Sequence, residues 1–188
     1  MRLRELPEMF EGNPVANGPL IKLTVMQGQA RVSAGPRVEL STVLGSCVAT
    51  CLYDPSVQLG GMNHFLLAEP DHNAGKVDEH YGVYLMEVLI NEMLANGATK
   101  SGLRAHLYGG ANLHAGMTKI GTANATFAQN FLERERIQIV RSDLGGTQAR
   151  RVDFRPAHGQ VRCRLVEPTV VPTEKPLPHR VTGDVELF

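Results

Sequence analysis

The clearest periodic signal in the chain predicts a helix over residues 81–95. Four apolar side chains recur there at the spacing of one helical face: Val83, Met86, Ile90 and Met93. An Asn-Gly pair follows directly and is typical of a helix end. A second helix is expected over residues 123–134, where Phe127 and Phe131 lie one turn apart.

Most other apolar residues occur in short runs rich in strand-forming side chains and bounded by turn residues. These runs predict strands at residues 21–26, 38–44, 47–53, 59–67, 103–108, 137–141, 150–154 and 161–166. The first four have no helix between them, which argues against a doubly wound alternation of strands and helices. We therefore predict an α/β fold in one domain with a mixed or antiparallel sheet.

Both ends of the chain lack this patterning. Residues 1–20 are rich in Pro and Gly, and residues 167–188 contain four prolines with no apolar period. We predict a flexible N-terminal segment at 1–20, a folded domain at 21–166 and a Pro-rich C-terminal tail at 167–188.

A cysteine and a histidine are predicted to lie close together in one hairpin. If residues 47–53 and 59–67 pair about a turn centred between Pro55 and Ser56, Cys47 lies directly opposite His64. Directly opposed residues share a sheet face, with Cβ atoms about 4.5–5.5 Å apart. A slip of one residue would move the histidine to the other face, and a buried thiol beside a structural histidine has the same spacing.

A thiol beside an imidazole can perform nucleophilic catalysis. The histidine accepts the thiol proton, and the thiolate attacks a carbonyl carbon. Gly45 and Ser46, directly before Cys47, permit an unusual backbone in which amide N–H groups could stabilise an oxyanion. On a primary amide this chemistry would release ammonia, and water would then hydrolyse the thioester.

Composition narrows the classes of partner and compartment. The 188 residues carry equal numbers of basic and acidic side chains, which argues against a nucleic-acid or anionic-membrane partner. No apolar stretch approaches the ~20 residues needed to cross a bilayer, and the charged N-terminus is unlike a signal peptide. An odd number of cysteines predicts free thiols in a reducing cytoplasm. We find no metal or cofactor motif, and Cys51 and Cys163 are expected to be structural.

Several separate segments together resemble the CheD family of chemotaxis proteins. They are STVLGSCVATCLYDP (41–55), GGMNHFLL (60–67), YGVYLMEVLINEMLANGA (81–98), LYGGANL (107–113) and IGTANATFAQNFLERERIQIVRSDLGG (120–146). The resemblance covers roughly residues 23–166, in the family's order and spacing.

The resemblance implies a cytoplasmic hydrolase, a protein-glutamine glutaminase that deamidates glutamines of methyl-accepting chemotaxis receptors. It implies an α/β sandwich similar to the catalytic domain of cytotoxic necrotizing factors, with a Cys-His-Thr triad and no cofactor. A CheC-type phosphatase is an implied regulatory partner. A different class of function is also possible, a module that docks on receptors or on CheC with little catalysis, and a weaker possibility is a thiol hydrolase with another substrate.

Carried onto this sequence, the resemblance makes Cys47 the nucleophile and His64 its base. The hydroxyl of the triad lies just upstream of the cysteine, where Ser41 and Thr42 are neighbours. Ser41 is the first choice from the longer family spacing, with Thr42 as the alternative; a serine would depart from the family's threonine. The two side chains point to opposite faces of a regular strand, so at most one can face the histidine.

Overall fold

The computed structural model describes residues 18–67, 80–113 and 118–166. The strands are β1 (Ile21–Thr24), β2 (Gln29–Ser33), β3 (Val38–Leu44), β4 (Val48–Asp54), β5 (Leu59–His64), β6 (Arg104–Gly109), β7 (Gln138–Leu144), β8 (Arg150–Arg155) and β9 (Gln160–Leu165). The helices are α1 (His80–Ala95) and α2 (Thr118–Arg134), with single 3-10 turns η2 (Lys100–Gly102) and η4 (Pro156–His158). The C-terminal tail and nearly all of the N-terminal segment lie outside the described residues, so their predicted character stays a prediction.

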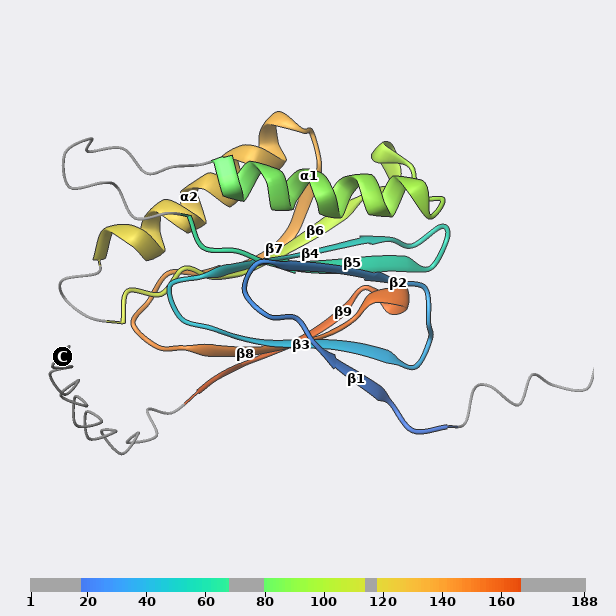
Figure 1. Ribbon diagram of the computed structural model, residues 1–188, viewed down its shortest axis with the longest axis horizontal. Helices are drawn as coiled ribbons and strands as arrows, with labels where there is room; N and C mark the ends of the chain where they lie inside the picture. The colour runs from blue at the N-terminus through green and yellow to red at the C-terminus, as the bar shows by residue number, and fades with distance from the viewer. Residues whose placement is uncertain (1–17, 68–79, 114–117, 167–188) are drawn as a thin grey trace, which may run out of the picture.

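The elements form three layers, with a five-stranded sheet in the middle (Figure 1). Its strand order is β2-β5-β4-β6-β7, and the four-stranded sheet that packs on one side has the order β1-β3-β8-β9. Helices α1 and α2 cover the opposite side (Figure 1). The pairs β1–β3 and β6–β7 are parallel and the remaining pairs are antiparallel, which confirms the predicted α/β domain with mixed sheets.

The two faces of the five-stranded sheet bury separate cores. Alternation of side chains along each strand sends one set toward the helices and the next set toward the other sheet. The helix-side core includes Leu52, Phe65, Leu89, Phe127 and Phe131. The core between the sheets includes Leu40, Leu44, Met62, Tyr108 and Phe154.

Local patterning located most elements within a few residues, but it missed β2. The strand Gln29–Ser33 pairs only with β5 and lies at the sheet edge. Its apolar side chains, Ala30 and Val32, are only partly buried, so the run has a weak hydrophobic signal. Helix α2 also begins earlier than predicted, at Thr118.

The predicted hairpin register is wrong by two residues. Cys51 pairs with Met62 and Asp54 with Leu59, so the turn between β4 and β5 is centred between Ser56 and Val57, not between Pro55 and Ser56. The Asp54 carboxylate stabilises this turn by accepting from the amide and hydroxyl of Ser56, at 2.9 and 2.6 Å. Since the shift is an even number, it moves His64 along the strand without changing its face.

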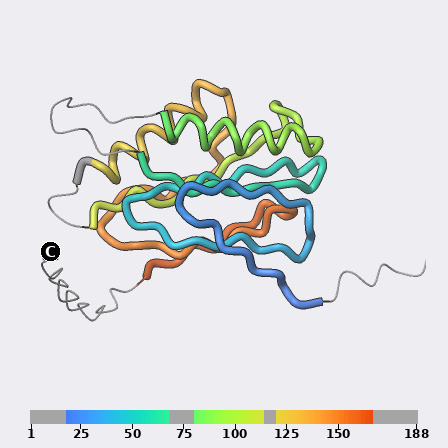
Figure 2. Tube along the Cα trace, in the orientation of Figure 1, coloured from blue at the N-terminus to red at the C-terminus, as the bar shows by residue number. Residues whose placement is uncertain are grey.

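The chain moves between the sheets several times, and one crossing creates the candidate site. It passes from the four-stranded sheet to the five-stranded sheet between β3 and β4 (Figure 2). Cys47 lies in this short link, at the edge of the core between the sheets. The nucleophile candidate is therefore attached to both sheets within a few residues.

Candidate active site

The end of β6 holds the backbone of Cys47. Gly110 N donates to Cys47 O at 2.8 Å, and Ala111 N donates to Gly45 O at 2.9 Å. Gly109 has φ 112°, and a Cβ atom there would overlap the carbonyl oxygen of Cys47. This approach requires glycine at 109, both for its backbone conformation and for the space it leaves. Gly109 and Gly110 were not site candidates from the sequence.

Asn124 joins the cysteine link to the segment that follows the histidine strand. Its side chain on α2 is fully buried. The Nδ2 atom donates to Ser46 O at 2.7 Å, and Oδ1 accepts from Leu67 N at 2.8 Å. One amide group thus satisfies two buried backbone groups on either side of the site. Sequence spacing gave no signal for this role, because Asn124 is far along the chain from both partners.

Gly45 does not have the positive φ that glycine adopts more readily than other residues. The glycines with positive φ around the site are Gly28, Gly109 and Gly110, and Gly45 is not among those of the described chain. A Cβ atom at Gly45 would lie 2.7 Å from Leu113 Cδ1, but this atom ends an exposed side chain that can turn away, so the contact does not require glycine. A contribution of Gly45 and Ser46 amides to an oxyanion site stays a prediction.

The ring of His64 is buried, with one nitrogen fixed by two partners. Nδ1 lies 2.9 Å from Thr42 Oγ1 and 3.3 Å from Val25 O. A carbonyl oxygen can only accept, so the contact with Val25 requires the proton on Nδ1. Nε2 is then the nitrogen with the free lone pair. Within the described parts of the chain this buried atom has no hydrogen-bond partner.

The two hydroxyl candidates point to opposite sides of β3. Thr42 faces His64 between the sheets, whereas Ser41 donates to Asp153 Oδ1 at 2.7 Å on the outer face. Burial alone would raise the pKa of Asp153, but hydrogen bonds from Lys22 and Ser41 outweigh it and lower that pKa to about 2. Ser41 is therefore engaged by the buried carboxylate of Asp153 and makes no hydrogen bond to the histidine.

The thiol of Cys47 and the ring of His64 share a sheet face, but the thiol hydrogen-bonds elsewhere. Cys47 Sγ donates to Gln27 Oε1 at 3.5 Å. Burial raises the pKa of Cys47, although its own backbone N–H lowers it in part. Burial lowers the pKa of His64, against a smaller opposite effect of Val25 O. Both shifts favour a neutral thiol and a neutral imidazole in the resting site.

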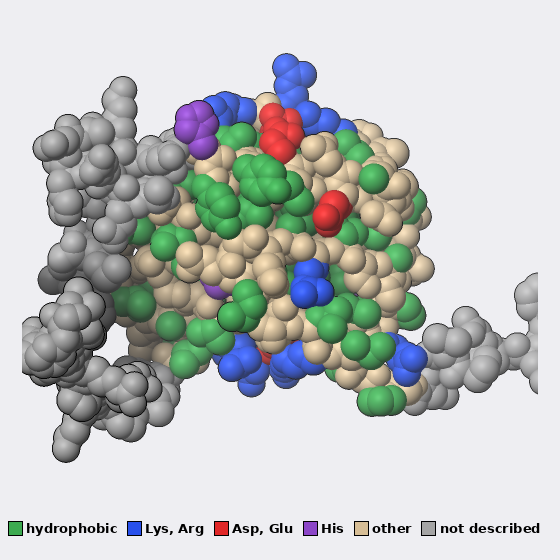
Figure 3. All heavy atoms as spheres, in the orientation of Figure 1, with side chains coloured by type: hydrophobic (Ala, Val, Ile, Leu, Met, Phe, Trp, Pro, Cys, Tyr) green, Lys and Arg blue, Asp and Glu red, His purple; other side chains and the backbone are tan. Residues whose placement is uncertain are grey.

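A cavity of about 400 Å³ opens beside the histidine. It is lined by Thr24, Val25, Met26, Gln27, Ser41, Thr42, Val43, His64 and Arg151. Met26 and Val43 are exposed apolar residues at its edge. In Figure 3 several basic side chains lie along the lower edge of the molecule, where the four-stranded sheet lies, and others lie along its upper edge. The cavity combines an apolar edge with a polar interior.

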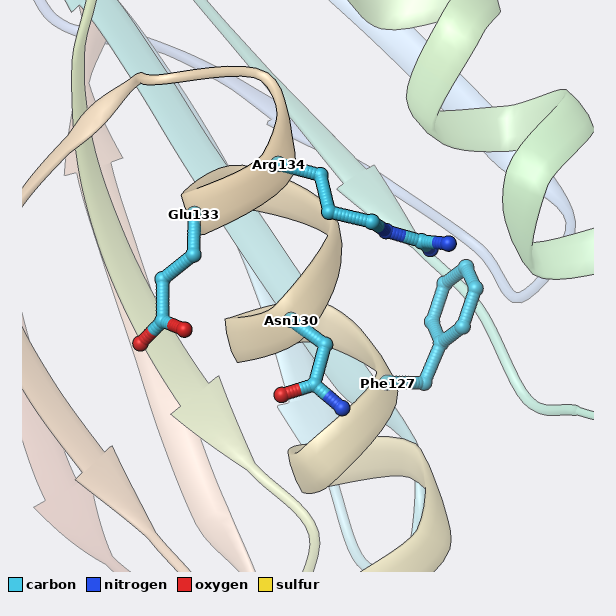
Figure 4. Close-up of a pocket in the computed structure, with 4 residues that line it drawn as sticks. All are labelled: Phe127, Asn130, Glu133 and Arg134. Atoms are coloured by element: carbon cyan, nitrogen blue, oxygen red, sulfur yellow. The ribbon is translucent and has the colours of Figure 1, made fainter.

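A second hollow lies on α2, on the helix side of the five-stranded sheet (Figure 4). Arg134 extends toward the ring of Phe127, while Glu133 points away from both (Figure 4). Asn130 completes the lining. These four residues include no nucleophile with an adjacent base, so this hollow is a poorer candidate for catalysis than the region around Cys47.

Other features of the site bear on cofactors and thiols. The described residues contain no group of three or more His, Cys, Asp or Glu side chains arranged to hold a metal ion. Of the helices in the same residues, none is long and apolar enough to cross a bilayer.

Cys47, Cys51 and Cys163 are all free thiols. Burial raises the pKa of Cys51 strongly, which suits an unreactive core position.

Comparison with known proteins gives one consistent family. The model of the family described as "CheD chemotactic sensory transduction" matches residues 66–165. A protein of Zymomonas mobilis is 57% identical over 172 residues, covering 89% of this chain and 92% of its own length. A protein of Caulobacter vibrioides is 49% identical over 177 residues, covering 89% and 94%. Both are named probable chemoreceptor glutamine deamidase CheD.

Similar solved structures are more distant. A Neisseria meningitidis protein of family DUF152 has a TM-score of 0.40 and 13% identity, covering 68% of this chain and 63% of its own. The hypothetical protein YfiH of Bacillus licheniformis has a TM-score of 0.32 and 21% identity, covering 42% and 26%. Neither likeness bears on the function.

Proposed function

Because this chain belongs to the CheD family, we propose that it is a chemoreceptor glutamine deamidase with Cys47 as its nucleophile and His64 as its base. The observation that carries the assignment of the base is the pair of contacts at Nδ1 of His64, from which we infer the tautomer. Its Nδ1 proton is engaged by Val25 O and Thr42, which leaves the lone pair on Nε2 available, on the sheet face that Cys47 shares.

The first half-reaction transfers the acyl group of a glutamine side chain to the enzyme. His64 Nε2 takes the thiol proton, and the Cys47 sulfur attacks the carboxamide carbon to form a tetrahedral oxyanion. The oxyanion collapses, the carbon–nitrogen bond breaks, and His64 returns the proton to the leaving amine as ammonia departs. A thioester between Cys47 and the substrate remains.

The second half-reaction consumes water. His64 Nε2 removes a proton from a water molecule, which attacks the thioester carbon. The carbon–sulfur bond breaks, the thiol is restored, and the product is a glutamate side chain. Backbone amides of the link that contains Gly45 and Ser46 are the candidates for stabilising both oxyanions, because the link leads directly into the nucleophile.

Thr42 acts as a positioning residue for His64 in this proposal. Thr42→Val keeps the shape but removes the hydroxyl that accepts from Nδ1. We expect kcat to fall about tenfold, the effect of losing one ordinary hydrogen bond in the transition state. Thr42→Ser should restore most of the rate.

Ser41→Ala is the matched control, since it removes the contact with Asp153 on the outer face. It should lower thermal stability, and its loss of kcat should be smaller than the loss caused by Thr42→Val. A larger loss of kcat from Ser41→Ala than from Thr42→Val would assign the positioning role to the serine instead.

The pH profile should have a wide plateau. Catalysis needs neutral His64, whose pKa lies below its ordinary value of 6.5, so kcat/KM should fall on the acid side only below pH 6.5. The thiol pKa lies above its ordinary value of 9.0, so the thiolate should accumulate only above pH 9. Steady-state rates and iodoacetamide alkylation across this range would check both limbs. A thiolate already present at neutral pH would contradict the neutral pair.

The direct test is a receptor assay. The purified protein is incubated with a chemoreceptor from the same organism, and receptor peptides are compared by mass before and after. We expect the mass gain of an amide-to-acid conversion at particular glutamines. Receptor that stays unmodified while binding is still measurable would contradict the deamidase proposal.

Two further expectations belong to this proposal. We place the enzyme in the cytoplasm, where a reducing environment keeps the catalytic thiol free. A CheC-type phosphatase is the regulatory partner implied by the family resemblance. Co-purification of the two proteins from one organism would test that partnership.

A further inference from the structure

Gln27 places a primary carboxamide against the nucleophile. It lies in the link between β1 and β2, and its side chain is exposed. Its Oε1 accepts from Cys47 Sγ at 3.5 Å, and it lines the cavity together with Thr42 and His64. The group at the thiol is thus chemically the same as the side chain that the proposed reaction consumes.

The backbone that carries Gln27 is fixed on both sides by the site itself. Val25 N donates to Ser41 O at 2.9 Å, and Gly28 N donates to His64 O at 2.8 Å. Gly28 has φ 84°, and a Cβ atom there would overlap the hydroxyl of Tyr81. The link therefore holds its position, whereas the exposed side chain of Gln27 can turn away without a change in the backbone.

The contact separates two groups that the reaction must bring together. The thiol proton of Cys47 is directed to Gln27, while the described residues offer no hydrogen-bond partner to Nε2 of His64. A buried nitrogen without a partner is costly, so the thiol would gain by turning to it once Gln27 leaves. Rotation of the Cys47 thiol from Gln27 to His64 Nε2 would thus convert the resting site into the reactive one.

We infer that Gln27 is a built-in stand-in for the substrate: its carboxamide occupies the substrate's carboxamide position in the free enzyme and holds the thiol away from His64 until a receptor glutamine displaces it. The inference rests on the proposed deamidase function. It deepens that function by naming a residue that sets the apparent affinity for substrate, because every productive binding event must first displace Gln27.

Two features explain why Gln27 is not itself consumed. Its carbonyl oxygen, not its carbonyl carbon, faces the sulfur, so the contact is a hydrogen bond and not an approach for attack. Burial also raises the pKa of Cys47, so the sulfur beside Gln27 stays protonated at neutral pH and is a poor nucleophile.

The test is the variant Gln27→Ala. Removing one weak competing hydrogen bond should lower KM for the receptor about threefold and leave kcat unchanged. Alkylation of Cys47 by iodoacetamide, which needs no receptor, should become faster by a similar factor. Gln27→Glu keeps the shape and accepts more strongly from the thiol, so it should slow alkylation relative to the native chain.

Gln138→Ala is the matched control, because Gln138 is an exposed glutamine on β7 and does not line the cavity. It should alter neither alkylation nor KM. A rise in KM or a fall in kcat for Gln27→Ala would make Gln27 a substrate contact and overturn the inference. So would conversion of Gln27 to Glu in the tryptic peptide 23–31 of the native chain, if Cys47→Ala prevents it.

The two assays separate the inference from the function on which it rests. Equal alkylation rates for the native chain and Gln27→Ala would overturn the stand-in role even if receptor deamidation proceeds. Absence of receptor deamidation, with alkylation rates that differ as expected, would overturn the proposed function, and with it the substrate-mimicking role of Gln27.

Discussion

Replacing Cys47 with serine should reduce receptor deamidation below detection while the fold persists. The sulfur is half-buried and donates one weak hydrogen bond, so an oxygen in its place disturbs little of the packing. A serine hydroxyl beside the same imidazole is a much weaker nucleophile than a thiol, because its pKa is far higher. The measurement is the mass gain of receptor peptides over time, with circular dichroism to confirm folding.

His64→Ala tests the other half of the pair and should lower kcat about 10²–10⁴-fold, the usual contribution of a general base. Raising the pH should restore part of the activity of this variant, because hydroxide can then generate the thiolate. The same rise in pH should not rescue Cys47→Ser. Undiminished deamidation by Cys47→Ser would remove Cys47 from the mechanism and leave it a structural thiol.

Asn124→Asp should produce the second large effect, on both stability and rate. The change keeps the acceptor for Leu67 N but replaces the Nδ2 donor with an oxygen that faces the carbonyl of Ser46 at 2.7 Å. A carboxylate at this fully buried site would also be desolvated, and the two hydrogen-bond partners of Asn124 are backbone groups, not cations. Leaving one buried group unsatisfied costs about 1–3 kcal/mol, and the buried charge adds to this.

The effect on catalysis follows from position. Ser46 is the neighbour of the nucleophile, so its release should let Cys47 shift relative to His64. Small displacements of reacting groups lower rates strongly, and we expect kcat to fall at least about tenfold under conditions where the variant is folded. Asn124→Ala should also lower kcat.

Asn130→Ala is the control for Asn124, since Asn130 is exposed on the same helix and points into the hollow on α2 (Figure 4). Asn130→Ala should change neither the free energy of unfolding nor kcat appreciably. The chain has no tryptophan, so urea unfolding is best followed by circular dichroism. An Asn124→Asp variant with native unfolding and native kcat would show that the bridge between Ser46 and Leu67 is dispensable.

The resting site differs from a preformed thiolate–imidazolium pair. Burial acts on both groups in the direction of neutrality, and Gln27 holds the thiol proton away from the ring. Such an enzyme exposes little reactive thiolate when no substrate is present. Activation then depends on the substrate glutamine entering the cavity, which ties reactivity of Cys47 to recognition.

The sequence by itself determined the features that depend on near neighbours in the chain. Helix α1 was predicted almost to the residue, because its apolar spacing and its Asn-Gly end are local signals. The shared face of Cys47 and His64 was also predictable, since it depends only on alternation along two joined strands. The register error of two residues did not change the face on which His64 lies, because an even shift preserves the alternation. Asp54 in this turn also accepts from Thr99 N at 3.1 Å, a distant partner that the strand pattern does not show.

Tertiary structure alone decided which hydroxyl meets the histidine. The family spacing favoured Ser41 over Thr42, but the packing of β3 between β1 and β8 turns Thr42 toward His64 and Ser41 toward Asp153. The same holds for Gln27, Gly109 and Asn124, which reach Cys47 or its link from distant segments. Their contacts are non-local hydrogen bonds and close approaches, for which neither periodicity nor spacing carries a signal.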